Sequence, residues 1–128
     1  MILHNKMSFL YGIHIPVNVC GRGLKIMHLG SVMINSMSDV GENCVFHANT
    51  ALVARGHGAG APQMGNGVVV GTHAVIVGGV KIGNNVAIGA NALVNKSFEE
   101  DNITIAGVPA KKISDHGSDM WGEVRTEA

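Results

Sequence analysis

Apolar residues recur at every sixth position through the middle of this chain, and glycine directly follows several of them. The apolar positions are Met64, Val70, Ile76, Ile82, Ile88 and Val94. An α-helix repeats every 3.6 residues and a half-buried strand repeats every two, so neither produces a strict period of six over this length. The pattern predicts a parallel β-helix, in which the short strands of residues 64–94 turn corners and stack coil upon coil.

The same spacing extends toward the N-terminus, with two interruptions. It continues through Ile34, Val40, Phe46 and Leu52, and an earlier coil begins with Cys20 and Ile26. The interval from Ile26 to Ile34 is eight residues, which predicts that two extra residues bulge outward there. The interval from Leu52 to Met64 is twelve, and its RGHGAGAP segment predicts a loop that leaves the coil.

Three hexapeptides make one triangular coil, so residues about 18 apart are expected to stack. This predicts two internal columns, Ile26–Phe46–Met64–Ile82 and Ile34–Leu52–Val70–Ile88. We expect an all-β fold of about four coils, with short irregular N-terminal and C-terminal segments. Residues 1–113 are predicted to form this single domain, and residues 114–128 a polar tail without periodicity.

Composition agrees with a small domain and argues against several partners. The chain has 128 residues, 46% of them hydrophobic and only 14% charged, and its formal net charge is zero. No basic face therefore predicts binding to nucleic acid or to an anionic membrane. There is no apolar stretch of 18 residues and no signal-peptide pattern, so we expect a cytoplasmic protein without membrane insertion. The two cysteines are too few for a disulfide framework.

Three segments resemble the hexapeptide-repeat acetyltransferases. They are GRGLKIMH at 21–28, VGENC at 40–44, and VGTHAVIVGGVKIGNNVAIGANALV at 70–94 followed by IAGVPAKKI at 105–113. The closest branch is that of the serine acetyltransferases, together with relatives that act on sugars and capsular polysaccharides. The resemblance implies a left-handed β-helix, a homotrimer, and transfer of an acetyl group from acetyl-CoA to a hydroxyl.

His28 is the leading candidate for a general base. Transfer to an alcohol requires removal of the hydroxyl proton, and neutral imidazole suits this task near neutral pH. His28 follows the inward-pointing Ile26 at an outward position, immediately before the expected bulge. By resemblance it also aligns with the catalytic histidine of the family.

The chain departs from the serine acetyltransferases at three positions. The aspartate that the family places fifteen residues before its histidine is Ile13 here, and the residue directly before the histidine is Met27 rather than aspartate. The family's second active-site histidine is replaced by Ala61. We therefore expect a sugar or polysaccharide hydroxyl as acceptor, with serine, as in cysteine biosynthesis, as the alternative. What orients His28 without an aspartate at position 13 is left open, a backbone carbonyl being one possibility.

Three further residues are candidates for binding the acceptor. His47 belongs to the coil next to His28, one residue short of the stacking position, and Arg55 and His57 lie in the Gly-rich loop. His73 follows a corner glycine and is expected on the surface. No His-x-His pair or His/Cys cluster has the spacing of metal ligands, so we expect no catalytic metal.

Small residues mark a possible coenzyme groove. The amides of a pantetheine arm are best held by backbone groups, which small side chains leave accessible. The candidates are Gly78, Gly79, Gly89, Ala90, Ala106 and Gly107. In the family, basic residues after the Gly-Val-Pro-Ala turn meet the nucleotide phosphates, which here points to Lys111.

Two other classes of protein remain as alternatives. A hexapeptide scaffold that has lost catalysis would explain the missing aspartate. A metal-dependent hydratase would need three ligands across a subunit interface, and only His47, His57 and His73 could supply them. If the chain is an acetyltransferase, cyclic assembly would combine His28 of one subunit with the coenzyme groove of the next.

Overall fold

The computed structural model describes residues 12–28, 30–56, 58 and 60–119, and all of its strands are short. They are Ile13–His14 (β1), Lys25–Ile26 (β2), Val32–Ile34 (β3), Asp39–Val40 (β4), Val45–Phe46 (β5), Thr50–Val53 (β6), Gln63–Met64 (β7), Val69–Val70 (β8), Val75–Val77 (β9), Lys81–Ile82 (β10), Ala87–Ile88 (β11), Leu93–Val94 (β12), Thr104–Ala106 (β13) and Lys111–Ser114 (β14). Strands this short follow from a six-residue repeat that must also provide a corner.

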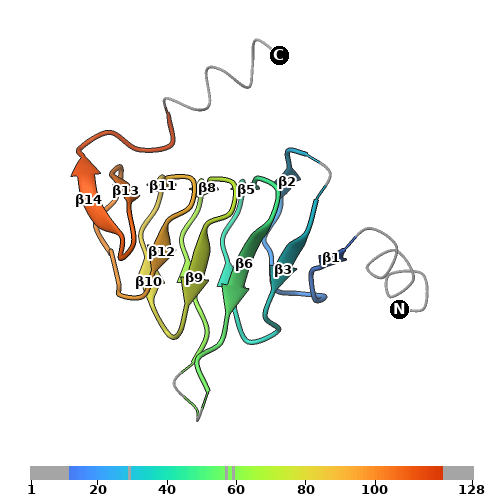
Figure 1. Ribbon diagram of the computed structural model, residues 1–128. Helices are drawn as coiled ribbons and strands as arrows, with labels where there is room; N and C mark the ends of the chain where they lie inside the picture. The colour runs from blue at the N-terminus through green and yellow to red at the C-terminus, as the bar shows by residue number, and fades with distance from the viewer. Residues whose placement is uncertain (1–11, 29, 57, 59, 120–128) are drawn as a thin grey trace.

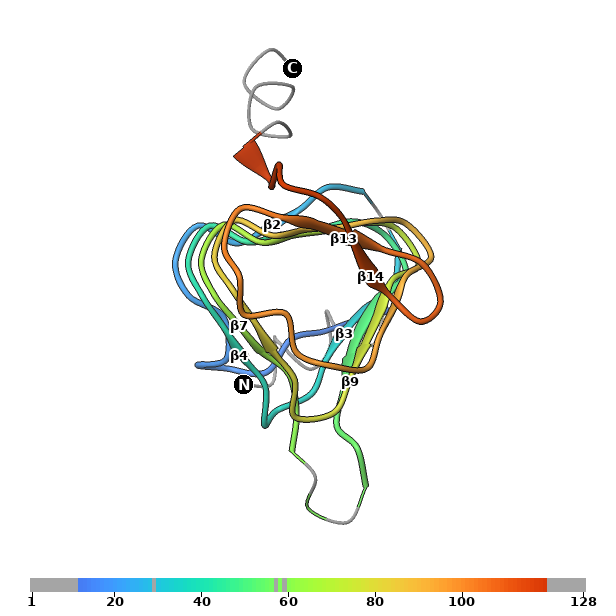
Figure 2. The same ribbon diagram turned by 90° about the vertical axis from the view of Figure 1, so that its left-hand side faces the viewer.

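The strands stack into three sheets around a common axis (Figure 1, Figure 2). Sheet A has the order β1-β3-β6-β9-β12, sheet B the order β4-β7-β10, and sheet C the order β2-β5-β8-β11-β13-β14. Every pairing is parallel except that of β13 with β14. Three parallel sheets of this kind form a left-handed β-helix, which confirms the fold class and the expected four coils.

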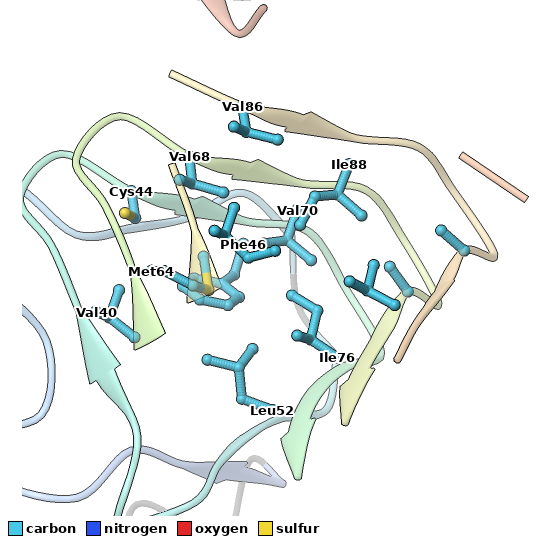
Figure 3. Packing of buried hydrophobic residues seen from close by; sticks show 14 of the residues in the cluster. Val40, Cys44, Phe46, Leu52, Met64, Val68, Val70, Ile76, Val86 and Ile88 are labelled. Atoms are coloured by element: carbon cyan, nitrogen blue, oxygen red, sulfur yellow. The ribbon is translucent and has the colours of Figure 1, made fainter. Parts of the chain in front are cut away.

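Each sheet contributes one column of apolar side chains to the interior, and corner residues such as Cys44, Val68 and Val86 fill the space beside them (Figure 3). Sheet C contributes Ile26, Phe46, Val70, Ile88 and Ile105; sheet A contributes Ile34, Leu52, Ile76 and Val94; sheet B contributes Val40, Met64 and Ile82. Close packing of these aliphatic groups around Phe46 leaves little room for polar atoms inside the coils.

The two predicted columns are therefore wrong where they cross the loop. Phe46 pairs with Val70 rather than stacking on Met64, and Leu52 pairs with Ile76 rather than with Val70. The predicted spacing of 18 residues counted the six residues after Leu52 as one face of a coil. The chain instead passes through a loop that projects from the coils between β6 and β7 (Figure 2). The loop itself was predicted, but its effect on the stacking was not.

The last strands close one end of the stack. β13 continues sheet C in parallel, and β14 then returns antiparallel beside it. Residues of the predicted tail also contact the coils: Ser118 is buried, its amide donates to the Asn85 carbonyl at 2.9 Å, and its hydroxyl donates to the Gly67 carbonyl. Within the described part of the chain, no helix is long and apolar enough to cross a membrane.

The tight stacking of the corners gives a test of the fold. A Cβ atom added to Gly65 would lie 2.8 Å from the carbonyl carbon and oxygen of Gly83 in the next coil. Because these backbone atoms are fixed by coil-to-coil hydrogen bonds, we expect Gly65→Ala to lower the free energy of unfolding by about 1–3 kcal/mol. Urea denaturation measures the change. Gly56 is the control, since a Cβ there meets nothing within 4 Å. Equal losses for Gly65→Ala and Gly56→Ala would contradict the stacking.

Candidate active site

Sheet C meets sheet A along an edge that carries His28, which we call the histidine edge. The edge runs through Ala48, Thr72, Ala90 and Gly107 on successive coils, and His28 lies beside it on the first coil. Ile26 pairs with Phe46 and Val32 with Thr50, so five residues of the first coil face three of the second.

Two contacts bracket the irregular part of the first coil. Met27 still donates its amide to the Phe46 carbonyl at 3.0 Å. A Cβ added to Gly30 would lie 2.7 Å from the Cβ of Ala48, so regular stacking resumes at Gly30. His28 therefore lies between Met27 and Gly30, in the irregular part of this corner next to the predicted bulge. Released from the ladder of strands, its side chain is exposed.

His47 lies close to His28, as the sequence suggested. The two ring centroids are 6.0 Å apart and the ring planes are inclined at 41°. His28 is exposed and His47 is half-buried, so the pair is open to solvent on one side. Two imidazoles at this separation can both contact one small molecule, one as a base and the other as a hydrogen-bonding partner.

Arg55 lies on a different edge, where sheet A meets sheet B, which we call the loop edge. Its amide donates to the Gly60 carbonyl at 3.1 Å across the base of the loop. Two predicted coenzyme residues are also here: a Cβ on Gly78 would lie 3.5 Å from the Cβ of Arg55, and one on Gly60 would lie 3.3 Å from the Cα of Gly79. Gly78 and Gly79 are thus separated from the histidine edge within one chain. His57 lies outside the described residues.

The remaining predicted coenzyme residues gather at the far end of the histidine edge. Gly89 and Ala106 are neighbours across β11 and β13, and a Cβ on Gly89 would lie 2.9 Å from that of Ala106. Ala90 and Gly107, one position further along, are exposed. Lys111 pairs with Ala106 in register and is also exposed. Small side chains beside an exposed cation make this end suitable for an anionic, amide-containing ligand.

Lys112, next to Lys111, is occupied within the chain. Its Nζ lies 2.7 Å from Asp115 Oδ1 and 2.8 Å from Glu100 Oε2. The hydrogen bonds to Asp115 and then to Glu100 raise the pKa of Lys112, and the same bond lowers the pKa of Asp115. Since Lys112 is tied to the chain's own carboxylates, Lys111 is the better placed of the two for a phosphate.

The histidine edge also contains residues that the sequence reasoning did not assign to a site. Asn49, His73 and Asn91 occupy equivalent corners and have left-handed backbones, with φ of 61°, 62° and 62°. Asn49 and Thr72 were missed, although the recurrence of Asn or His after a small residue or threonine at each corner was a usable signal.

In the part of the chain described, no group of three or more His, Cys, Asp or Glu side chains is arranged to hold a metal ion.

Comparison with known proteins agrees with this architecture. The family model "Bacterial transferase hexapeptide (six repeats)" matches residues 61–96. A serine acetyltransferase from Synechococcus elongatus is 33% identical over 88% of this chain and 47% of its own length. A UDP-3-O-acylglucosamine N-acyltransferase from Sulfurimonas denitrificans is 33% identical over 61% of this chain and 24% of its own length.

Solved structures give the same result. The serine acetyltransferase of Neisseria gonorrhoeae superposes with a TM-score of 0.79 at 31% identity, over 92% of this chain and 48% of that one. The serine acetyltransferase of Brucella abortus in complex with coenzyme A gives 0.74 at 29% identity, over 90% of this chain and 47% of that one. The chain thus spans less than half the length of these relatives.

Fold, repeat and matches together define a class of protein: residues 61–96 carry the repeat of the bacterial hexapeptide transferases, within a left-handed β-helix. Within that class, its sequence and its structure are similar to those of serine acetyltransferases. The relatives with known structures therefore favour the serine alternative over the sugar acceptor that the sequence suggested.

The two cysteines take no part in this site, and their chemistry is testable. Burial, and then the neighbouring Cys44 thiol, raise the pKa of Cys20 to about 11, and burial also raises the pKa of Cys44. At pH 8 about 0.1% of Cys20 would be thiolate, the form that reacts with alkylating agents. We expect iodoacetamide to label neither residue of the folded protein at this pH, and both after unfolding in guanidinium, as measured by mass spectrometry. Rapid labelling of Cys20 in the folded protein would contradict the shift.

Proposed function

We propose that this chain transfers an acetyl group from acetyl-CoA to a hydroxyl acceptor, with His28 as the general base. One observation supports this above the others: His28 lies at the bulge that interrupts the coil ladder, on an exposed edge, in a chain similar to serine acetyltransferases. A histidine with only a structural role would need no interruption of the repeat.

The chemistry proposed for His28 is proton transfer in both directions. Its neutral imidazole takes the proton of the acceptor hydroxyl as that oxygen attacks the thioester carbonyl. The carbon–sulfur bond then breaks, and the imidazolium returns the proton to the departing thiolate. His47, with its ring centroid 6.0 Å away, is proposed to contact the acceptor from the neighbouring coil.

The histidine edge fits the coenzyme in length and composition. Ala90 lies three coils from His28 along this edge, or about 14 Å at the usual spacing of neighbouring strands. We propose that the pantetheine arm follows this edge, with backbone groups near Gly89, Ala90, Ala106 and Gly107 binding its amides. Lys111 at the far end would then meet a phosphate as a point charge.

Serine is our first candidate for the acceptor, and a sugar hydroxyl is the second. The serine acetyltransferases among the relatives support serine. Ile13 and Ala61, where serine acetyltransferases have a carboxylate and a histidine, support an acceptor with fewer charged groups than an amino acid. Arg55 is, with Lys96, a described cation of the loop edge, and its guanidinium would suit the carboxylate of serine.

We further propose that the active site is shared between subunits of a homotrimer. Sheet A lies between the histidine edge and the loop edge, so packing against its outer face brings the loop edge of one subunit to the histidine edge of the next. That outer face is mostly apolar, with Met33 46% exposed beside the exposed His14 of β1. The outward residues of β6, β9 and β12 are Ala51, Val53, Val75, Val77 and Leu93. The outer face of sheet B is instead polar, with Asp39, Gln63 and Lys81.

Substitution of His28 tests the proposed activity. We expect His28→Ala to lower the rate of thiol release from acetyl-CoA in the presence of acceptor by about 10²–10⁴-fold, the usual contribution of a general base. The assay compares serine with a panel of sugars. His116→Ala is the control, because this exposed histidine lies beyond β14, away from the histidine edge. Full activity of His28→Ala would eliminate the role of base, and a wild-type chain that binds no coenzyme A would favour a non-catalytic scaffold.

Mixing two inactive variants tests the shared site. If one subunit supplies His28 and its neighbour supplies Arg55, then co-refolding His28→Ala with Arg55→Ala chains restores intact sites. In a random trimer made from equal amounts, about a quarter of the interfaces combine the two intact residues. We expect activity to recover to about a quarter of the wild-type value, in proportion to those interfaces. No recovery, with trimers present by sedimentation, would contradict the sharing of these two residues.

A further inference from the structure

We propose that Asn49, His73 and Thr72 form a hydrogen-bonded relay that positions the bulge carrying His28. This inference rests on the proposed function, because it supplies what orients the base in a chain that has Ile13 where the family has a carboxylate. The three residues are positioning residues: they act on His28 through the backbone rather than on the substrate.

The relay crosses three coils of the histidine edge. Ser31, three residues after His28, donates its amide to Asn49 Oδ1 at 3.2 Å. Asn49 Nδ2 lies 3.3 Å from His73 Nε2. Thr72 Oγ1 lies 3.3 Å from His73 Nδ1 and 2.7 Å from the Ala48 carbonyl.

The donors and acceptors of this relay are compatible with one arrangement. The Thr72 hydroxyl donates its proton to the Ala48 carbonyl, so toward His73 it acts as acceptor and Nδ1 is protonated. His73 Nε2 then has a lone pair, which accepts from the Asn49 amide nitrogen. With the Asn49 amide nitrogen facing His73, Asn49 Oδ1 faces the Ser31 amide and accepts from it. If the Asn49 amide were flipped, its NH₂ group would face the Ser31 N–H, and two donors would oppose each other.

The edge between sheets B and C is held without such a relay. Where sheet B meets sheet C, the coils are joined directly: the amides of Glu42, Asn66 and Asn84 each donate at 2.8 Å to the side-chain oxygen one coil further on. Those corners are in register. At the histidine edge the Ser31 amide also donates to a side-chain oxygen one coil further on, but the first coil has two extra residues and the accepting Asn49 is itself bonded to His73 in the coil after.

The expected consequence is a more narrowly defined position for the His28 imidazole. The bulge is fixed at its start by the Met27 amide, which donates to the Phe46 carbonyl, and at its end by the Ser31 amide. Losing the second contact would let the segment between them sample more conformations. General-base catalysis depends on the base reaching the hydroxyl at hydrogen-bond distance, so such freedom lowers the rate of the chemical step.

The first experiment measures hydrogen exchange at the Ser31 amide in the full chain. The variants are Asn49→Gly and His73→Gly, with Asn91→Gly as control, since glycine tolerates the left-handed backbone that all three positions share. We expect exchange at Ser31 about two- to tenfold faster in the first two variants, the effect of losing one hydrogen bond, and unchanged in the control. Unchanged exchange in His73→Gly would overturn the relay.

The second experiment separates positioning from folding. In His73→Gly we expect kcat to fall about tenfold with KM for acetyl-CoA unchanged, as for a misplaced base. In His73→Gln the amide oxygen can take the place of Nε2 as acceptor, so kcat and Ser31 protection should return toward the wild-type values. Long-range ¹H–¹⁵N spectra should show Nδ1 of His73 protonated. A protonated Nε2 in the neutral imidazole, or an unchanged kcat in His73→Gly, would overturn the proposal.

The two experiments also distinguish this inference from the proposed function. If the wild-type chain transfers no acetyl group, the proposed function fails, while hydrogen exchange and the tautomer of His73 still decide whether the relay exists. If the wild type is active and His28 is essential but Ser31 exchange is insensitive to Asn49 and His73, the relay fails and the proposed function stands.

Discussion

Backbone hydrogen bonds between successive coils are the constraint on which the rest of this molecule depends. In sheet C, for example, the amides of His47, Gly71 and Gly89 donate to carbonyls one coil further on at 2.8–3.0 Å. Each coil must therefore present the same outline as its neighbour. The interior can hold only a fixed volume of apolar side chain per face, and the corners can hold almost no side chain where glycines approach one another. A regular coil therefore offers few positions for a catalytic or binding side chain.

The two irregular segments, the bulge and the loop, lie at the two corners that flank sheet A, where they do not interrupt the pairing of strands. A bulge or a loop placed at a corner leaves the strand pairs on both sides intact, as Val32 with Thr50 and Leu52 with Ile76 illustrate. The protein can thus present an imidazole on one edge and an arginine-bearing loop on the other without disturbing its core. The face between these edges carries mostly apolar side chains, and it is the face that the proposed trimer would bury.

Much of the fold could be predicted from the sequence because a period of six has few other physical solutions. The loop and the bulge were also visible, as intervals of twelve and eight residues. The stacking across the loop was not, since the spacing alone cannot say whether residues in phase with the repeat occupy a face. For the site, proximity of His28 and His47 followed from coil geometry. The contacts of Asn49 did not, because they depend on which way a corner side chain turns. Gly78 and Gly89 look alike in the sequence yet lie on different edges.

The antiparallel strand β14 limits how the molecule can grow. A stack of parallel coils invites another coil at its end, and two copies could in principle add end to end into a fibre. β14 instead turns back along β13 and presents Lys111 and Lys112 at the margin of sheet C, with Lys112 bound to Asp115 and Glu100. A reversed, charged margin is a poor template for a further parallel coil. This end of the stack therefore does not favour the end-to-end addition of another parallel coil.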